Sequence, residues 1–399
     1  MKRALILLLV GLMVFAPAAF AGAAERTVIR FAAQGDSTPG TRAVLDAFNA
    51  AQDKYTVEWV EMTNDSGAMR DQLITSLRAG SSDYDIFSLD VVWAGEFAAA
   101  GYIEPIDAYM RDAGLSVAQF NSGSMASGRY AGKQYVLPFF PDLGFLYFRK
   151  DIVSADDAAK LVGGDYTTAD LIAMAEKYKG QGGTADGFVY QSGKYEGLIC
   201  NANEFTGNFK NVRAGLEAMK KATDSPGTPA DILNYTEGET HNSFINGQSV
   251  FARNWPYQWG VIISEGSIKT DQVDVAPLPY GGSVGGWLLA MNAKSANKAG
   301  AWELIKFIAS DGQKEFSLKG GYLPGLNAVM NDPDVIAGNI LLSKDGFKKA
   351  LGTTIARPVS PEYSKLSDAL QEAIYAYLSG SANLDATAAT VEKVLAENK

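Results

Sequence analysis

Short β-rich runs alternate with amphipathic helical segments through the first ninety residues, and this alternation most constrains the fold. The runs at 28–32, 55–60 and 85–89 are rich in β-branched and aromatic residues and end in turn-forming sequence. The segments at 44–48 and 69–79 place apolar side chains at helical spacing. Strands that alternate with helices in this way predict an α/β domain with a largely parallel sheet.

The central segment 135–148 (YVLPFFPDLGFLYF) differs from the alternating region before it. It is aromatic, it is too long for one ordinary strand, and Pro138 and Pro141 interrupt it. We therefore predict two extended pieces that cross from a first domain to a second. A length of 399 residues agrees with two domains, since a domain commonly has about 100–200 residues. Further helices are predicted over 168–179, 301–318 and 362–378, and further strands over 249–253 and 288–292.

The N-terminal segment has the three parts of a secretory signal. Basic residues at positions 2 and 3 precede an apolar run at 4–15, and small residues follow as far as Ala21. A membrane anchor needs roughly 20 apolar residues, and Pro17 interrupts this run too early. We predict a signal peptide over 1–21 and export to the periplasm. No cysteine lies near the cleavage site, so no lipid anchor is expected.

Composition excludes much familiar enzyme chemistry. The chain has one histidine and one cysteine, His241 and Cys200, so neither a disulfide nor a zinc site built from these residue types is expected. Acidic residues outnumber basic ones by 45 to 35 without a basic block, which argues against a nucleic-acid partner. The glycine-rich stretch 281–286 lacks the lysine of a phosphate loop. We expect no catalytic residue, no metal and no cofactor, and we interpret His241 as a surface helix residue.

Several loops combine aromatic rings with carboxylates or glycines. A planar ring suits the apolar face of a pyranose, and a carboxylate can accept two hydroxyl hydrogen bonds. Such residues at element ends are expected around a ligand cleft. This pattern predicts a polyhydroxylated, uncharged ligand. The residues concerned are Asp90 with Trp93, Phe140 with Asp142, Trp255 with Tyr257, and Gly286 with Trp287. The loop Gln34–Gly40 and Asp90 also follow predicted strands, at whose carboxyl ends ligands of such sheets bind.

Several motifs, taken in their order along the chain, resemble the extracellular solute-binding proteins of sugar ABC importers (family 1), and within them the trehalose/maltose-binding branch. The resemblance covers essentially the whole chain after residue 21. The motifs are YDIFSLDVVW at 84–93, EFA at 96–98, GYI at 101–103, LPFFPD at 137–142, RKD at 149–151, NWPY at 254–257, GGW at 285–287, GGYLP at 320–324 and RPV at 357–359.

The resemblance implies an α/β fold with two lobes, a hinge of crossing segments, and a ligand between the lobes. The implied N-terminal lobe comprises 22–138 and 288–327, and the C-terminal lobe comprises 139–287 and 328–399. It also implies specific roles for residues of the cleft. Asp90 and Asp142 would accept sugar hydroxyls; Trp255, Tyr257 and Trp287 would stack on sugar rings; the Gly286 backbone would approach the ligand; Arg357 and Arg70 would donate hydrogen bonds.

Two positions depart from the pattern of that branch. The first loop has Gln34 and Asp36 where a carboxylate is expected slightly further along, and Phe140 stands where relatives often have tyrosine. The loss of that tyrosine hydroxyl is expected to influence which disaccharide fits.

The function implied is that of a monomeric periplasmic protein that captures a neutral disaccharide or short oligosaccharide by hinge closure. Trehalose, maltose and sucrose are the expected sugar types, and the permease subunits of the importer are the expected partners. Two alternatives stay open from the residues alone. One is a secreted glycoside hydrolase, which would use a pair of carboxylates such as Asp90 and Asp142. The other is a protein that binds a polyol, an amino acid or a peptide.

Overall fold

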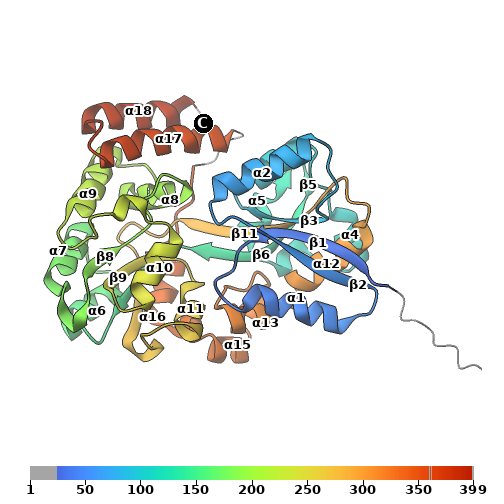
Figure 1. Cartoon of the computed structure of the whole chain (residues 1–399), viewed down its shortest axis with the longest axis horizontal. Coiled ribbons are helices and arrows are strands. Elements are labelled where there is room, and N and C mark those ends of the chain that lie inside the picture. The colour runs from blue at the N-terminus through green and yellow to red at the C-terminus, as the bar shows by residue number, and fades with distance from the viewer. Residues whose placement is uncertain (1–24, 359, 361, 398–399) are drawn as a thin grey trace, which may run out of the picture.

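Two larger β-sheets, each with its own helices and core, form two lobes that lie side by side (Figure 1). The computed structural model describes residues 25–358, 360 and 362–397. The predicted signal peptide, 1–21, and Val359 of the RPV motif therefore lie outside the described residues. None of the helices in these ranges is both long and apolar enough to cross a membrane.

The first lobe is built on a sheet of five strands in the order β2-β1-β3-β11-β6. Strand β1 pairs in parallel with β2 and with β3, whereas β11 runs antiparallel to β3 and β6. The elements of this lobe are β1 (Thr27–Gln34), α1 (Gly40–Ala51), β2 (Tyr55–Met62), α2 (Ser66–Arg78), β3 (Ile86–Asp90), α3 (Ala94–Ala99), α4 (Asp107–Asp112), α5 (Ser122–Ser127), β4 (Arg129–Tyr130), β5 (Lys133–Gln134), β6 (Val136–Leu143), β11 (Val284–Met291), α12 (Lys298–Ala309) and α13 (Gln313–Gly320).

Helices cover both faces of this sheet because its strands bury side chains on both sides. In β1, Ile29 and Phe31 belong to the core under α1 and α12, while Ala32 belongs to the opposite core under α2 and α3. Successive side chains of a strand point to opposite faces, so a doubly covered strand is apolar at almost every position. The helices supply the matching apolar faces, such as Val44 and Phe48 on α1.

The second lobe is built on a sheet of four strands in the order β10-β7-β9-β8. Its core is one large cluster that extends to the C-terminal helices. The elements are β7 (Phe145–Arg149), α6 (Ala155–Gly163), α7 (Thr168–Tyr178), β8 (Asp186–Val189), α8 (Glu196–Thr206), α9 (Val212–Asp224), α10 (Glu237–Ile245), β9 (Ser249–Asn254), α11 (Gln258–Ser264), β10 (Val273–Ala276), α14 (Asn327–Met330), α15 (Pro333–Gly338), α16 (Asp345–Leu351), α17 (Tyr363–Leu378) and α18 (Leu384–Glu397).

The chain passes between the two sheets at neighbouring points. Gly144 separates β6 of the first sheet from β7 of the second, and its N–H donates to the carbonyl of Ser283, just before β11. Ile355 pairs with Ser283 as an isolated bridge. Gly144 is constrained there, because a Cβ at this position would lie 2.2 Å from the side chains of Arg253 and Glu204. The predicted domain limits at 138/139 and 287/288 fall within β6 and β11, and these limits stay a prediction.

Three of the predicted elements differ from the structure. The first sheet is mixed, because β11 enters it antiparallel from the second lobe. This strand begins at Val284, so Gly286 and Trp287 lie within the strand and not in a loop before it. The helix predicted over 301–318 is two helices, α12 and α13, which share one apolar core and are interrupted around Gly312.

Candidate ligand-binding site

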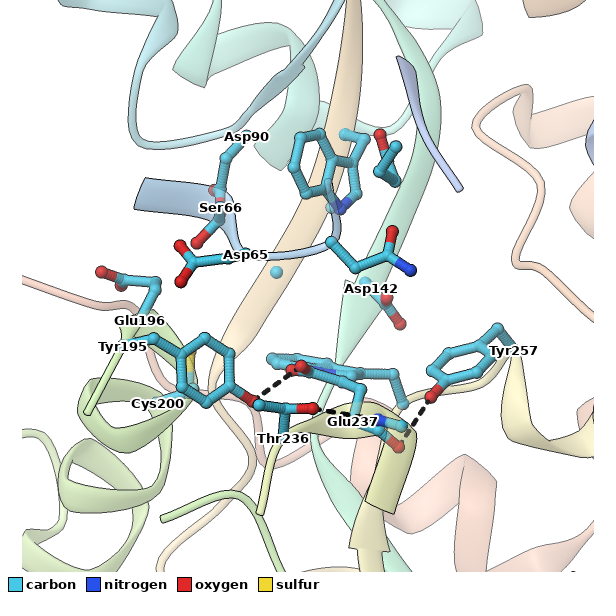
Figure 2. A pocket seen from close by; sticks show the side chains of 18 of the residues that line it. Asp65, Ser66, Asp90, Asp142, Tyr195, Glu196, Cys200, Thr236, Glu237 and Tyr257 are labelled. Atoms are coloured by element: carbon cyan, nitrogen blue, oxygen red, sulfur yellow. Dashed lines mark hydrogen bonds between the residues drawn. The ribbon is translucent and has the colours of Figure 1, made fainter. Parts of the chain in front are cut away.

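A cavity of about 310 Å³ lies between the two lobes. In the close-up, Asp65, Ser66 and Asp90 of the first lobe face Tyr195, Glu196, Thr236 and Glu237 of the second across an open space (Figure 2). The first-lobe residues follow from the topology, since the carboxyl ends of the parallel strands β1 and β3 open on this side. Ligands of open α/β sheets bind at such ends.

Arg357 joins the two walls of the cavity. Its guanidinium donates to both carboxylate oxygens of Asp90, at 2.6 and 3.3 Å, and to Oε1 of Glu196 at 2.9 Å. Asp90 is the last residue of β3 in the first lobe, and Glu196 is the first residue of α8 in the second. All three side chains are largely buried. A single arginine thus compensates two carboxylates that approach from different lobes.

Glu196 accepts hydrogen bonds from three side chains. Besides Arg357, the hydroxyls of Tyr363 and Ser367 on α17 donate to it, each at 2.5 Å. Burial raises the pKa of Glu196, and the charge of Arg357 opposes that rise. This carboxylate is therefore engaged by protein groups on both of its oxygens.

Asp142 has far fewer partners. Its carboxylate accepts a hydrogen bond from the N–H of Leu143, the next residue, at 3.1 Å. Burial raises the pKa of Asp142 well above its ordinary value; the Leu143 N–H and the charge of Arg253 oppose the rise, and Glu237 and Asp90 add to it. A desolvated carboxyl with free acceptor capacity, placed on a cavity wall, is suited to bind ligand hydroxyls.

Aromatic rings form the apolar part of the wall. Trp255 and Tyr257 follow β9, and Trp287 lies within β11. The guanidinium of Arg253 lies 4.0 Å from the centre of the Trp255 ring and covers one face of it. A planar ring that is supported on one face can offer the other face to a sugar.

The backbone at Gly286 approaches its neighbours closely. Its φ is +130°, a conformation that favours glycine, and an added Cβ would lie 2.8 Å from the carbonyl oxygen of Phe140. At Gly285 an added Cβ would lie 3.0 Å from the Trp255 ring. The two glycines therefore allow β11 to pass directly behind the aromatic wall.

The structure brings nine of the eleven predicted ligand-binding residues to the cavity lining. Gln34 belongs to this group, and its Oε1 is buried without a hydrogen-bond partner. The nine are Gln34, Asp90, Phe140, Asp142, Trp255, Tyr257, Gly286, Trp287 and Arg357.

The other two predicted residues are engaged elsewhere. Asp36 accepts hydrogen bonds from the N–H groups of Thr38 and Thr41 at the start of α1, and from the Tyr322 hydroxyl at 2.8 Å. Arg70 is paired with Glu96 and lines an adjoining interlobe cavity of about 240 Å³, which shares Asp65, Ser66, Tyr195 and Glu196 with the larger one. Neither side chain lines the 310 Å³ cavity.

Sequence reasoning missed several lining residues of the second lobe: Tyr195, Glu196, Cys200, Thr236, Glu237 and His241. They come from the starts of α8 and α10, where nothing in the local pattern marks a cleft. His241 was interpreted as a surface residue, and this is wrong: it is 8% exposed, and its Nδ1 lies 2.8 Å from the Tyr257 hydroxyl. Burial lowers the pKa of His241. Cys200 is a buried thiol whose pKa burial raises.

The described residues contain no cluster of three or more histidine, cysteine, aspartate or glutamate side chains that could hold a metal ion. The cavity instead combines carboxylates, one arginine and aromatic rings between two α/β lobes. A fold and a site of this kind define a two-lobed binding protein that encloses a small ligand between its lobes.

Comparison with known families agrees with this class. Residues 34–315 match the model of the bacterial extracellular solute-binding proteins, which is most of the chain. The chain therefore belongs to this family. A probable ABC transporter-binding protein of Deinococcus radiodurans is 29% identical over an alignment of 384 positions, which covers 86% of this chain and 87% of the relative. A maltotriose-binding protein of Pyrococcus abyssi is 26% identical over 309 residues, covering 73% of this chain and 64% of the relative.

The solved structures give the same picture. The maltose-bound MalE3 protein of T. maritima superposes with a TM-score of 0.83 at 28% identity, over 93% of this chain and 99% of that protein. The two-lobed fold expected from the sequence is confirmed. The chain is a bacterial extracellular solute-binding protein, and proteins of this family bind substrates without converting them.

Proposed function

We propose that this protein captures a disaccharide or short oligosaccharide of the maltose, trehalose or sucrose type and delivers it to the permease of an ABC importer. The observation that carries the proposal is the pairing of unsatisfied carboxylate capacity at Asp142 with the rings of Trp255 and Trp287 in one interlobe cavity. A pyranose presents both an apolar face and a set of hydroxyls, so it uses both kinds of group. The maltose bound by MalE3 and the maltotriose of the Pyrococcus protein support this class.

In this proposal each lining group has a role. Asp142, Asp90 and the free acceptor of Gln34 receive ligand hydroxyls, and Arg357 donates to a hydroxyl or ring oxygen. Trp255, Tyr257 and Trp287 stack on sugar rings. The Gly286 backbone and Phe140 limit the space, and Phe140 does so without contributing a hydroxyl. The proposed ligand is uncharged, so it needs no cationic side chain besides Arg357.

Capture would proceed by closure of the lobes around the ligand. The points where the chain passes between the sheets, at Gly144, Ser283 and Ile355, would absorb the change of backbone angle. The ligand shifts the equilibrium by as much as its affinity for the closed form exceeds its affinity for the open one. The lobe limits at 138/139, 287/288 and 327/328 remain a prediction from the resemblance; the first two fall within β6 and β11, a few residues from these crossing points. The protein would act as a monomer in the periplasm, after removal of residues 1–21.

Tryptophan fluorescence tests the proposal directly, since Trp255 and Trp287 line the cavity. Purified protein is titrated with trehalose, maltose, maltotriose, sucrose and glucose, and the sugar is recovered afterwards for chromatography. We expect saturable binding of at least one di- or trisaccharide, which is recovered intact. Absence of a response to every sugar would contradict the proposal, and recovery of hydrolysed sugar would favour the glycosidase instead.

A further inference from the structure

Two side chains on one face of helix α10 hydrogen-bond to aromatic rings of the cavity, and both also belong to the cavity lining. Glu237 is the first residue of the helix, and His241 follows one turn later. Oε1 of Glu237 accepts from the indole N–H of Trp255 at 3.1 Å, and Nδ1 of His241 lies 2.8 Å from the Tyr257 hydroxyl. Residues four apart on a helix share a face, so one rigid element contacts both rings.

The Glu237 carboxylate reaches a third ring as well. Its other oxygen, Oε2, accepts from the hydroxyl of Tyr195 at 2.6 Å, as the dashed line in Figure 2 shows. The backbone carbonyl of the same residue lies 3.4 Å from the Tyr257 hydroxyl. One acidic residue therefore touches three aromatic side chains that line the cavity.

The helix that carries these two residues is well anchored. Thr236 precedes it as the N-cap, and its hydroxyl accepts from the N–H of Gly238. Further along, Thr240, Phe244 and Ile245 are buried, the last two in the core of the second lobe. Because the helix itself is fixed, the aromatic rings that hydrogen-bond to its side chains are restrained as well.

The Trp255 indole is thereby restrained in its plane and at its edge. Arg253 covers one face of the ring, Gly285 lies against its far edge, and Glu237 binds the N–H. A ring that is fixed before the ligand arrives loses less conformational entropy on binding than a ring that can rotate.

We infer that Glu237 and His241 are positioning residues, which fix the planes of Trp255 and Tyr257 so that the two rings form one preorganised sugar-stacking wall. This inference rests on the proposed function and deepens it. The residues act through the rings, and a ligand long enough to contact both rings depends on them most. The sequence does not predict either role, because the partners of Glu237 and His241 are 16 or more residues away along the chain.

Glu237→Ala is the informative variant, and Glu237→Gln keeps an acceptor for the indole N–H. Glu239→Gln, on the same helix, is the matched control: it removes a charge without touching the rings, and the amide oxygen can still accept from Thr236 in the capping box at the start of the helix. Calorimetry with the sugar that binds the wild type is expected to give at least about 10-fold weaker affinity for Glu237→Ala, and values within about 3-fold for the two glutamine variants.

An NMR measurement on the sugar-free protein tests the positioning role independently of the proposed function. The six tryptophans give six indole N–H signals in a proton–nitrogen-15 NMR spectrum. The signal that disappears in a Trp255→Phe variant is the signal of Trp255. Its exchange with solvent is expected to speed up in Glu237→Ala and to stay slow in Glu237→Gln. His241→Phe is expected to weaken affinity as well, with Tyr257→Phe adding little to it, since both remove the same hydrogen bond.

Two results would overturn the inference. One is a Glu237→Ala protein that folds and binds sugar within 3-fold of the wild type. The other is a Glu237→Gln protein as weak as Glu237→Ala, which would show a direct contact between the charge and the ligand. If the wild type binds no sugar at all, the proposed function fails, while the indole exchange still decides the positioning role.

Discussion

Replacing Arg357 with methionine tests whether the two lobes meet through a compensated charge cluster. Methionine keeps much of the side-chain length but removes the guanidinium, which donates to Asp90 and to Glu196. The two carboxylates belong to different lobes, and both are largely buried. Without the cation, closing the lobes brings two uncompensated negative charges together.

The structure sets the size of the effect. Breaking a buried ion pair by removing one partner commonly costs about 3–5 kcal/mol, because a buried charge is left unpaired. Here the three side chains are 3%, 9% and 13% exposed, so the interaction is poorly screened by solvent. Lobe opening offers one route to relief, since it hydrates both carboxylates. We therefore expect a loss of about 3 kcal/mol in the free energy of unfolding, together with sugar affinity at least about 100-fold weaker.

The assay combines urea unfolding, followed by circular dichroism and tryptophan fluorescence, with calorimetric sugar titration at pH 7. Arg111→Met is the matched control, because Arg111 and its partner Asp112 are each 73% exposed and such a pair contributes about 0–1 kcal/mol. The loss in the free energy of unfolding caused by Arg357→Met is expected to shrink as the pH is lowered. Burial already raises the pKa of Glu196, and loss of the arginine raises it further, so the carboxyl takes up a proton that removes the repulsion.

An Arg357→Met protein as stable as the control at pH 7 would refute this reasoning. Wild-type sugar affinity in that variant would refute it as well, because the closed cavity would then need no cation. If the loss of stability grew as the pH was lowered, repulsion between the two ionised carboxylates could not be its cause.

Three further predictions follow from the cavity wall. Trp287→Ala should weaken sugar affinity by about 10-fold or more while changing the melting temperature little, since the ring is only half-buried; equal losses in both would indicate a structural tryptophan. Sugar affinity should fall as the pH is lowered through the raised pKa of Asp142, because ligand hydroxyls favour the ionised carboxylate. The stability of the sugar-free protein should instead fall as the pH rises through the same range, because burial favours the protonated carboxyl. Asp142→Asn should flatten both pH profiles, and unchanged profiles in this variant would contradict the assignment. Gly286→Ala should cost about 1–3 kcal/mol and weaken binding, while Gly95→Ala, which meets no atom within 4 Å, should be neutral or slightly stabilising in thermal unfolding.

The first lobe was predictable in detail because its signals are local. The strands at 28–32, 55–60 and 85–89 and the helices between them correspond to β1, β2, β3, α1 and α2. Asp90 and Gln34 could be placed near a ligand because the ends of parallel strands converge. The antiparallel entry of β11 could not be foreseen, since its pairing with β3 joins residues about two hundred positions apart.

The second lobe was harder to predict because its contribution to the cavity comes from helix starts. Tyr195, Glu196 and Glu237 reach the cavity only through the packing of α8 and α10, and glutamates usually lie on the surface. His241 shows the same limit, since its burial depends on its contact with Tyr257, sixteen residues away.

The position of a bound sugar tests the account most directly, and a crystal structure of the protein grown with the sugar that binds tightest would provide it. We predict that the sugar lies in the 310 Å³ cavity, with one ring face on Trp255 or Trp287 and hydroxyls within hydrogen-bond distance of Asp142. A sugar found outside this cavity, or inside it without contact to Asp142 or either tryptophan, would contradict the account.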